Sequence, residues 1–120
     1  MHSEAWAVSQ RALDAIATAR EEGRRVIAVG TTVVRALESL PPLPSWPNSG
    51  GLCGVTELLI APPWEFRLID GLLTNFHLPR STLLALVAAM IGIQPLRAAY
   101  AAAIAANYRF YSYGDAMLIA

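Results

Sequence analysis

Thr74-Asn75-Phe76-His77-Leu78-Pro79-Arg80-Ser81-Thr82 is the stretch that decides the fold. It joins an apolar, strand-like run to a longer apolar run with the pattern of a helix. Leu78 precedes a proline, which keeps its backbone extended. Alternate side chains of an extended segment share a face, so we expect Asn75 and His77 to point the same way. One of the two hydroxyl residues at the end suits the N-cap of the following helix. Such strand-to-helix junctions are where open α/β sheets tend to bind ligands.

The composition indicates one domain that lacks part of its surroundings. The chain has 120 residues, a formal net charge of zero and 55% hydrophobic residues. Zero net charge gives no bulk attraction to nucleic acid or to an acidic membrane, although a local basic patch would still permit tRNA binding. The longest apolar run, residues 83–93, is shorter than the ~20 residues that span a bilayer, so we expect no membrane association. A single cysteine, Cys53, favours a cytoplasmic protein. The apolar surplus suggests an oligomer or a longer protein.

The first third of the chain has the pattern of an α/β protein. Apolar residues at three- and four-residue spacing predict an amphipathic helix over Glu4–Glu22. A buried strand is predicted over Arg25–Val29, of the continuously apolar kind found in parallel sheets. Gly30-Thr31-Thr32 then forms a tight turn into a helix over Val33–Leu40.

The remainder continues this alternation after a long loop. Residues 40–55 are rich in proline and glycine and are predicted to be loop. Asp70 falls inside a predicted strand, where burial would require a hydrogen bond or an ion pair. The predicted elements are strands over Thr56–Ile60, Glu65–Leu73 and Ala116–Ile119, and helices over Leu83–Ile91 and Leu96–Ala106.

Two strand-to-helix junctions share one polar pattern. Gly30-Thr31-Thr32 is followed by Arg35, and the second junction ends in Arg80-Ser81-Thr82. Hydroxyls and free N–H groups at a helix start can bind an anion. An arginine near the positive end of the helix dipole is unfavourable unless it gains a contact. The alternative is that Arg35 pairs with Glu38 and that Arg80 is merely exposed.

Other side chains suggest chemistry less specifically. Residues 108–113 combine three tyrosines with Phe110 and Arg109, which suits stacking on unpaired bases or adenine. The alternative is that these rings fill a core. His77, Asp70 and Asp115 are candidate acids or bases. The two histidines lack metal-ligand spacing, so no metal site is predicted.

Four motifs in this order closely resemble one family, the S-adenosylmethionine:tRNA ribosyltransferase-isomerases of queuosine biosynthesis. They are His2-Ser3-Glu4; residues 28–39, Ala-Val-Gly-Thr-Thr-Val-Val-Arg-Ala-Leu-Glu-Ser; residues 74–83, the opening stretch with Leu83; and residues 108–117, Tyr-Arg-Phe-Tyr-Ser-Tyr-Gly-Asp-Ala-Met. The resemblance runs along the whole chain but covers only the C-terminal part of the family. It implies that residues 1–120 are one C-terminal segment of the large catalytic domain, a fragment of a barrel-like α/β domain with short buried strands alternating with helices. The family's N-terminal region and inserted small β-barrel domain have no counterpart here. Pro62-Pro63-Trp64 and Tyr111 depart from the family pattern.

The resemblance implies a reaction and its partners. The family moves the ribosyl unit of S-adenosylmethionine onto 7-aminomethyl-7-deazaguanine, at the wobble position of tRNA with a GUN anticodon. The product is epoxyqueuosine, and adenine and methionine are released. S-adenosylmethionine serves as co-substrate, and no prosthetic group or metal is implied. The missing N-terminal region or an oligomer partner would complete the protein.

The resemblance also assigns roles to residues. His77 would be the general acid or base, because the pKa of an unperturbed histidine lies near neutrality. Asp70 or Asp115 would orient it or contact ribose hydroxyls. S-adenosylmethionine would be bound by Gly30, Thr31, Thr32, Arg35, Thr74, Asn75, Phe76 and Tyr113. The tRNA would be bound by Arg80, Ser81, Thr82, Tyr108, Arg109 and Tyr111.

Two other interpretations remain open from the sequence. One is a catalytically inactive truncated fragment or partner subunit that binds tRNA or another chain. The other is an unrelated α/β nucleotide-binding enzyme that shares only the junction pattern.

Overall fold

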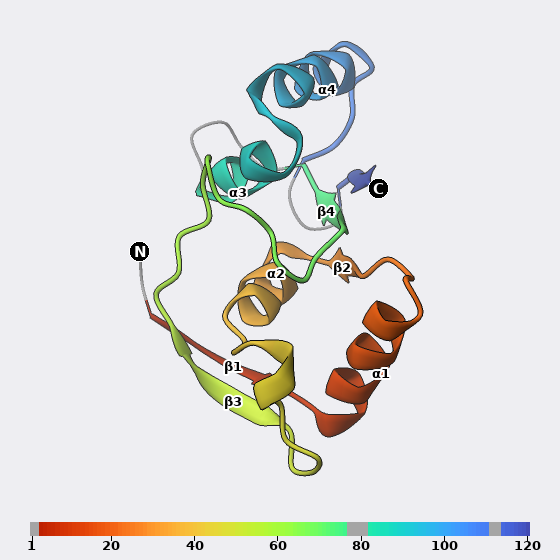
Figure 1. The fold of residues 1–120 in the computed structure, drawn as a ribbon. Coiled ribbons are helices and arrows are strands. Elements are labelled where there is room, and N and C mark those ends of the chain that lie inside the picture. The colour runs from red at the N-terminus through yellow and green to blue at the C-terminus, as the bar shows by residue number, and fades with distance from the viewer. Residues whose placement is uncertain (1–2, 77–81, 111–113) are drawn as a thin grey trace.

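The computed structural model describes residues 3–76, 82–110 and 114–120 and shows a mixed α/β fold (Figure 1). Its elements are β1 (Glu4–Val8), α1 (Gln10–Glu21), β2 (Ile27–Val29), α2 (Thr31–Glu38), the short 3-10 helix η1 (Leu43–Ser45), β3 (Leu52–Thr56), β4 (Gly71–Asn75), α3 (Thr82–Ile91), α4 (Ile93–Ala105) and β5 (Ala116–Ile119). The predicted α/β class is therefore confirmed.

The strands form two sheets. In one, β1 pairs antiparallel with β3; in the other, β4 lies between a parallel β2 and an antiparallel β5. Within the described part of the chain the strands do not close into a barrel. The parallel pair arises because β2 and β4 are separated by α2 and a long connection, as a crossover requires.

The predicted helix over Glu4–Glu22 is wrong in its first third. Residues 4–8 form β1, which pairs with β3, and helix α1 begins only at Gln10. Ser9 is the N-cap, and its side chain accepts a hydrogen bond from the backbone N–H of Ala12 at 3.1 Å. An N-cap satisfies one of the N–H groups that a helix start leaves free, so it marks the boundary. Apolar spacing alone predicted helix for residues 4–8 as well, because their partner strand β3 lies more than forty residues later and leaves no local signal.

The predictions for residues 40–73 need correction in three places. The predicted loop over 40–55 includes η1 and most of β3, and the predicted strand over Thr56–Ile60 shares only Thr56 with β3. The predicted strand over Glu65–Leu73 is strand only from Gly71. Its earlier N–H groups are bound by the Glu38 carboxylate, so they are satisfied without a neighbouring strand.

Asp70 is exposed and lies just before β4, which corrects the prediction that it is buried within a strand. Its Oδ2 accepts a hydrogen bond from the backbone N–H of Val26 at 2.8 Å. The same oxygen lies 3.5 Å from Nη1 of Arg20. Asp70 therefore joins the N-terminal ends of the two parallel strands.

Five predicted elements are confirmed with small shifts at their ends. β2 occupies the last three residues of the predicted strand, and β5 has the predicted bounds. The helices begin earlier than predicted: α2 by two residues, α3 by one and α4 by three. Gly30 is the N-cap of α2 and has φ of 90°, a conformation that glycine adopts without the steric penalty of a side chain.

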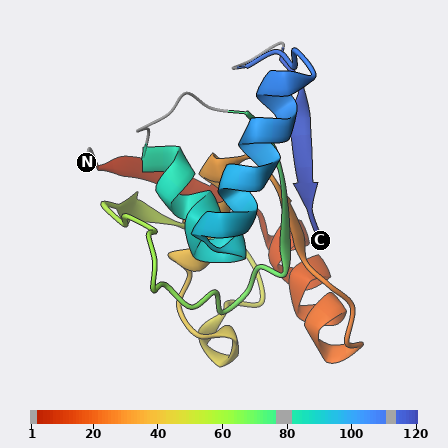
Figure 2. The ribbon, with the colours of Figure 1, turned by 90° about the horizontal axis from the view of Figure 1, so that it is seen from above.

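Two apolar clusters hold these elements together. The larger contains Ala28, Leu72, Val34, Leu37, Leu86 and Val87, so α2 and α3 cover one face of the β2-β4-β5 sheet. The smaller joins Phe76, just after β4, to Tyr100 and Ala103 of α4, which lies above the end of β4 in Figure 1. Figure 2 shows the sharp bend between α3 and α4, which is 117°. Among the described residues no single helix has the length and apolarity to cross a membrane, although α3 and α4 taken together do.

Candidate functional site

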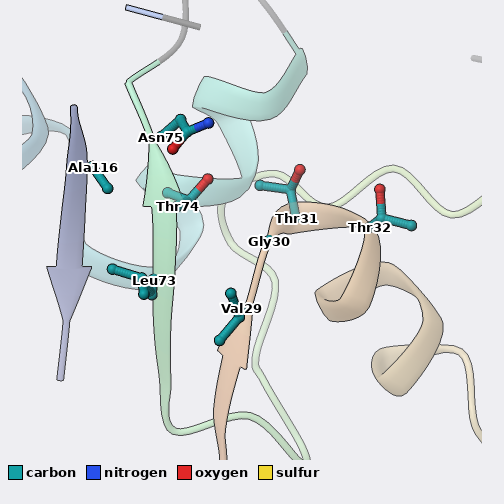
Figure 3. A pocket seen from close by; sticks show the side chains of 8 residues that line it. All are labelled: Val29, Gly30, Thr31, Thr32, Leu73, Thr74, Asn75 and Ala116. Carbon is teal, nitrogen blue, oxygen red and sulfur yellow. The ribbon is translucent and has the colours of Figure 1, made fainter. Parts of the chain in front are cut away.

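The parallel pairing of β2 and β4 brings the first strand-to-helix junction beside the end of β4. Val29 is in register with Leu73, and the N–H of Gly30 donates to the carbonyl oxygen of Leu73 at 2.8 Å. Both strands end at the same edge of the sheet, where β2 continues directly into α2 (Figure 3). The carboxyl ends of parallel strands are the usual place for a ligand in such folds.

A cavity of about 360 Å³ lies at this edge. In Figure 3 the hydroxyl oxygens of Thr31, Thr32 and Thr74 and the amide of Asn75 gather at the strand ends above the apolar side chains. Thr31 and Thr74 are buried residues of this wall. Its lining residues, none of them charged, are Val29, Gly30, Thr31, Thr32, Leu73, Thr74, Asn75 and Ala116.

The start of α2 adds backbone donors to these hydroxyls. The first N–H groups of a helix have no carbonyl one turn earlier to bind, and they carry the positive end of the helix dipole. Here they belong to Thr31 and the residues after it, beside the cavity. The wall can therefore hold a carboxylate or neutral polar group by hydrogen bonds without a charged side chain.

Five of the predicted S-adenosylmethionine-binding residues line this one cavity: Gly30, Thr31, Thr32, Thr74 and Asn75. They come from two segments that the sequence separates by more than forty positions. The residue types at each junction were visible in the sequence, but their meeting depends on the strand pairing.

Arg35 is not part of the cavity wall, which corrects the prediction that it contacts an anion there. It is buried, its Nη1 binds the carboxylate of Glu4, and its Nε donates to the carbonyl oxygen of Leu58 at 3.2 Å. The alternative pairing with Glu38 is also wrong. Arg35 lies on the face of α2 that meets β1, so β1 supplies its counter-ion, and its Nη2 is buried with no partner among the described residues.

Glu38 is a structural residue that the sequence reasoning missed. It is 2% exposed, and its carboxylate accepts four hydrogen bonds from the segment before β4. The donors are Trp64 Nε1 and the N–H of Arg67 to Oε1, and the N–H groups of Leu68 and Ile69 to Oε2. The sequence did contain a signal for its burial: Glu38 lies one helical turn after Val34 and therefore on the same, inward face of α2.

Neither candidate aspartate lines the cavity, although Asp115 lies at the cavity end of β4, directly before the lining residue Ala116. Asp70 is at the opposite end of β4 from Asn75, and five residues at about 3.3 Å each separate them by roughly 16 Å. Asp115 is exposed, and its Oδ2 accepts from the N–H of Arg109 at 2.7 Å, while its carbonyl oxygen accepts from the N–H of Phe76 at 3.2 Å. Both aspartates tie backbone segments together at opposite ends of the strand.

Part of the aromatic segment fills a core. Phe76 is 4% exposed, and its ring centroid lies 5.2 Å from Tyr100, 5.8 Å from Tyr108 and 5.5 Å from Phe110. The core-filling alternative therefore holds for Phe110, and Phe76 supports the end of β4 from its buried side. Tyr108 is 47% exposed despite its edge contact with Phe76, and Arg109 and Thr82 are exposed.

Several candidates lie outside the described residues. These are His77, Arg80, Ser81, Tyr111 and Tyr113, together with His2 of the first motif. Their assigned roles stay predictions. Within the described ranges no three or more His, Cys, Asp or Glu side chains come together as a metal site would require.

The comparisons with known proteins agree with one another. A family model described as a queuosine biosynthesis protein matches residues 1–119. The S-adenosylmethionine:tRNA ribosyltransferase-isomerases of Cupriavidus pinatubonensis and Thermus thermophilus are 53% and 52% identical, each over 99% of this chain and 34% of the relative. A crystal structure of the S-adenosylmethionine tRNA ribosyltransferase from Thermotoga maritima superposes with a TM-score of 0.84 at 47% identity, over 97% of this chain and 40% of that one. The chain thus spans about a third of the length of the curated relatives it matches.

Proposed function

Because the chain belongs to the family of queuosine biosynthesis proteins, we propose that it is one segment of a tRNA-modifying S-adenosylmethionine:tRNA ribosyltransferase-isomerase. It would be the C-terminal segment of the large α/β domain and would act in the cytoplasm. The cavity at the ends of β2 and β4 is its contribution to the active site. The observation that carries this proposal is the parallel register that gathers Gly30–Thr32 and Thr74–Asn75 around one cavity.

The proposed reaction transfers the ribosyl unit of S-adenosylmethionine to the aminomethyl group of a 7-deazaguanine in tRNA with a GUN anticodon. The sulfonium makes the hydrogens on C5′ acidic, so a base removes one of them. An acid assists the departure of adenine. The aminomethyl nitrogen forms the new bond to the sugar, and the bond between C5′ and the sulfonium sulfur breaks, which releases methionine. The sugar becomes the epoxycyclopentanediol of epoxyqueuosine.

The cavity residues suit the polar ends of S-adenosylmethionine. The methionyl carboxylate would accept hydrogen bonds from the N–H groups and hydroxyls at the start of α2, where the helix dipole favours a negative charge. The Thr74 hydroxyl and the Asn75 amide would bind ribose hydroxyls, for which a neutral wall is sufficient. His77 follows Asn75 by two residues and is the proposed base.

The surfaces beyond the cavity would take the tRNA. Tyr108 and Arg109 are exposed next to the Phe76 cluster, at the end of β4 that carries the cavity. An exposed tyrosine ring and a guanidinium plane suit stacking on unpaired bases. Thr82, exposed at the start of α3, and the residues just before it would contact phosphate.

A chimeric enzyme tests this proposal. This chain replaces the segment that it matches in the Thermus thermophilus relative, and the measured quantity is transfer of labelled ribosyl from S-adenosylmethionine to precursor tRNA. We expect transfer, its loss in His77→Ala, and a KM for S-adenosylmethionine raised about three- to tenfold by Thr31→Val, the value of one neutral hydrogen bond. Thr18→Val, at an exposed position of α1, is the matched control and should leave KM unchanged.

Two outcomes would reject the proposal. A folded chimera without transfer, beside an active parent enzyme, would favour the inactive-fragment interpretation. Equal KM values for Thr31→Val and Thr18→Val would remove the cavity from the binding of S-adenosylmethionine.

A further inference from the structure

Asp115 binds the backbone of Arg109 at the cavity end of β4. Its Oδ2 accepts a hydrogen bond from the N–H of Arg109 at 2.7 Å, and its own N–H donates to the Arg109 carbonyl oxygen at 2.9 Å. Its carbonyl oxygen accepts from the N–H of Phe76, just after β4, at 3.2 Å. One residue therefore fixes both backbone groups of Arg109 to the end of this strand.

This contact lies directly beside the candidate site. Ala116, the residue after Asp115, is in register with Asn75, and both line the cavity (Figure 3). Ribosyl transfer needs the tRNA base beside S-adenosylmethionine, so the cavity edge is also where the tRNA must approach. The backbone of Arg109 is thus held next to the path of the tRNA.

Arg109 combines a fixed backbone with an exposed side chain. The ring centroids of its neighbours Tyr108 and Phe110 lie 5.8 and 5.5 Å from that of Phe76, so both flanking residues pack against the end of β4. Arg109 itself is exposed, and none of the ion pairs among the described residues includes its guanidinium. A fixed backbone lowers the entropy that is lost when the side chain binds a ligand. A guanidinium held in this way suits a phosphate or an unpaired base.

Gly114 permits the close approach of these two segments. A Cβ at this position would lie 2.8 Å from the carbonyl oxygen of Arg109 and 2.7 Å from that of Phe110, which is closer than side chains approach backbone atoms. The Arg109 carbonyl is the same one that accepts the N–H of Asp115. A larger residue at position 114 would therefore displace Arg109 from the contact.

We propose that Asp115 is a positioning residue for tRNA binding, which holds Arg109 at the cavity edge so that its guanidinium contacts the tRNA beside the modified nucleotide. The inference rests on the proposed function, because it names how the same site holds its tRNA. Asp115 does not line the cavity, and one of its carboxylate oxygens is already engaged by the Arg109 N–H. Its carboxylate acts as a hydrogen-bond acceptor and neither exchanges a proton with the substrate nor binds ribose.

Kinetics of the chimeric enzyme, with each substrate varied in turn, test the inference. Asp115→Ala removes the acceptor, so KM for precursor tRNA should rise about three- to tenfold, the value of one hydrogen bond, while kcat and KM for S-adenosylmethionine stay unchanged. Asp115→Asn keeps an acceptor oxygen without the charge and should leave KM for tRNA close to that of the parent. Gly114→Ala should raise KM for tRNA as Asp115→Ala does. Asp14→Ala, at an exposed carboxylate of α1, is the matched control and should change neither KM.

A double variant shows whether Asp115 acts through Arg109. Arg109→Gln should itself raise KM for tRNA. Adding Asp115→Ala to it should then change KM little, because the side chain that Asp115 positions is already absent. Additive effects would overturn the inference, since Asp115 would then contact the tRNA by itself.

Three further outcomes would overturn the inference. One is a large loss of kcat in Asp115→Asn, which would show that the carboxylate takes part in proton transfer. Another is an equal rise of both KM values in Asp115→Ala, as a general disturbance of the fold would produce. The third is an unchanged KM for tRNA in Asp115→Ala, which would leave the proposed function intact.

Filter binding of precursor tRNA separates this inference from the proposed function, because it requires no catalysis. A chimera that transfers no ribosyl but shows the same order of tRNA affinities among the variants would support the positioning role and reject the proposed function alone. A folded chimera that binds no tRNA would overturn both.

Discussion

Replacing Glu38 by glutamine should destabilise the fold strongly although it changes few atoms. The carboxylate is 2% exposed and accepts four hydrogen bonds, two on each oxygen. The amide oxygen of glutamine can accept one pair of these donors. The amide NH₂ then faces the other pair, donor against donor, and those two groups lose their acceptor.

The expected magnitude follows from these two lost bonds. A hydrogen bond to a charged acceptor contributes about 1.5–3 kcal/mol, so losing two costs about 3–6 kcal/mol. The neutral amide recovers part of this because burying a charge is itself costly. We expect a net loss of about 2–4 kcal/mol, a large fraction of the roughly 5–15 kcal/mol that stabilises a domain.

Urea unfolding measures this loss, with Trp64 fluorescence as a probe because its Nε1 donates to Glu38. Glu57→Gln, at an exposed carboxylate on the surface, is the matched control and should change the free energy of unfolding by less than about 0.5 kcal/mol. A Glu38→Gln protein within 0.5 kcal/mol of the parent would refute the reasoning. It would mean that the segment before β4 is held by other contacts.

Three further predictions concern the site and its support. Gly30→Ala should lower the free energy of unfolding by about 1–2 kcal/mol in urea titrations, because φ is 90° although no atom lies within 4 Å of the added Cβ; an unchanged midpoint would contradict that backbone conformation. Phe76→Ala should lower the free energy of unfolding by about 3–5 kcal/mol in the same titrations. The control Leu59→Ala, at a half-exposed position, should lower it by less than about 1 kcal/mol, and similar losses in both variants would argue against the Phe76 cluster. Asp70→Asn should leave the KM for S-adenosylmethionine in the chimera unchanged and cost at most about 1 kcal/mol of stability. It weakens one exposed ion pair, while the asparagine oxygen can still accept the hydrogen bond from the N–H of Val26; a severalfold rise in KM would show that Asp70 acts at the cavity.

The sequence determined those elements whose signals are local. The long apolar runs of α3 and α4, the short apolar run of β5 and the glycine before α2 could be recognised within short windows. The polar residues at the two strand ends were recognised for the same reason. Four motifs in order also identified the family, which the match over residues 1–119 confirms.

The tertiary structure decided everything that depends on partners distant in the chain. β1 exists as a strand because β3 pairs with it, and Arg35 is a core residue because Glu4 on that strand neutralises it. The Glu38 carboxylate accepts the backbone hydrogen bonds that a neighbouring strand would otherwise accept from the segment before β4. No local pattern of that segment reveals this. In each case a backbone or charged group is satisfied from another element.

The stretch from Thr74 to Thr82 shows where this division falls. Its residue types alone predicted a polar strand end leading into a helix, and β4 and α3 lie on either side as expected. Its first two residues became part of a cavity only because β2 pairs with β4 in parallel and in a register that sets Val29 beside Leu73. Register depends on contacts across the whole sheet, so it could not be read from either strand by itself.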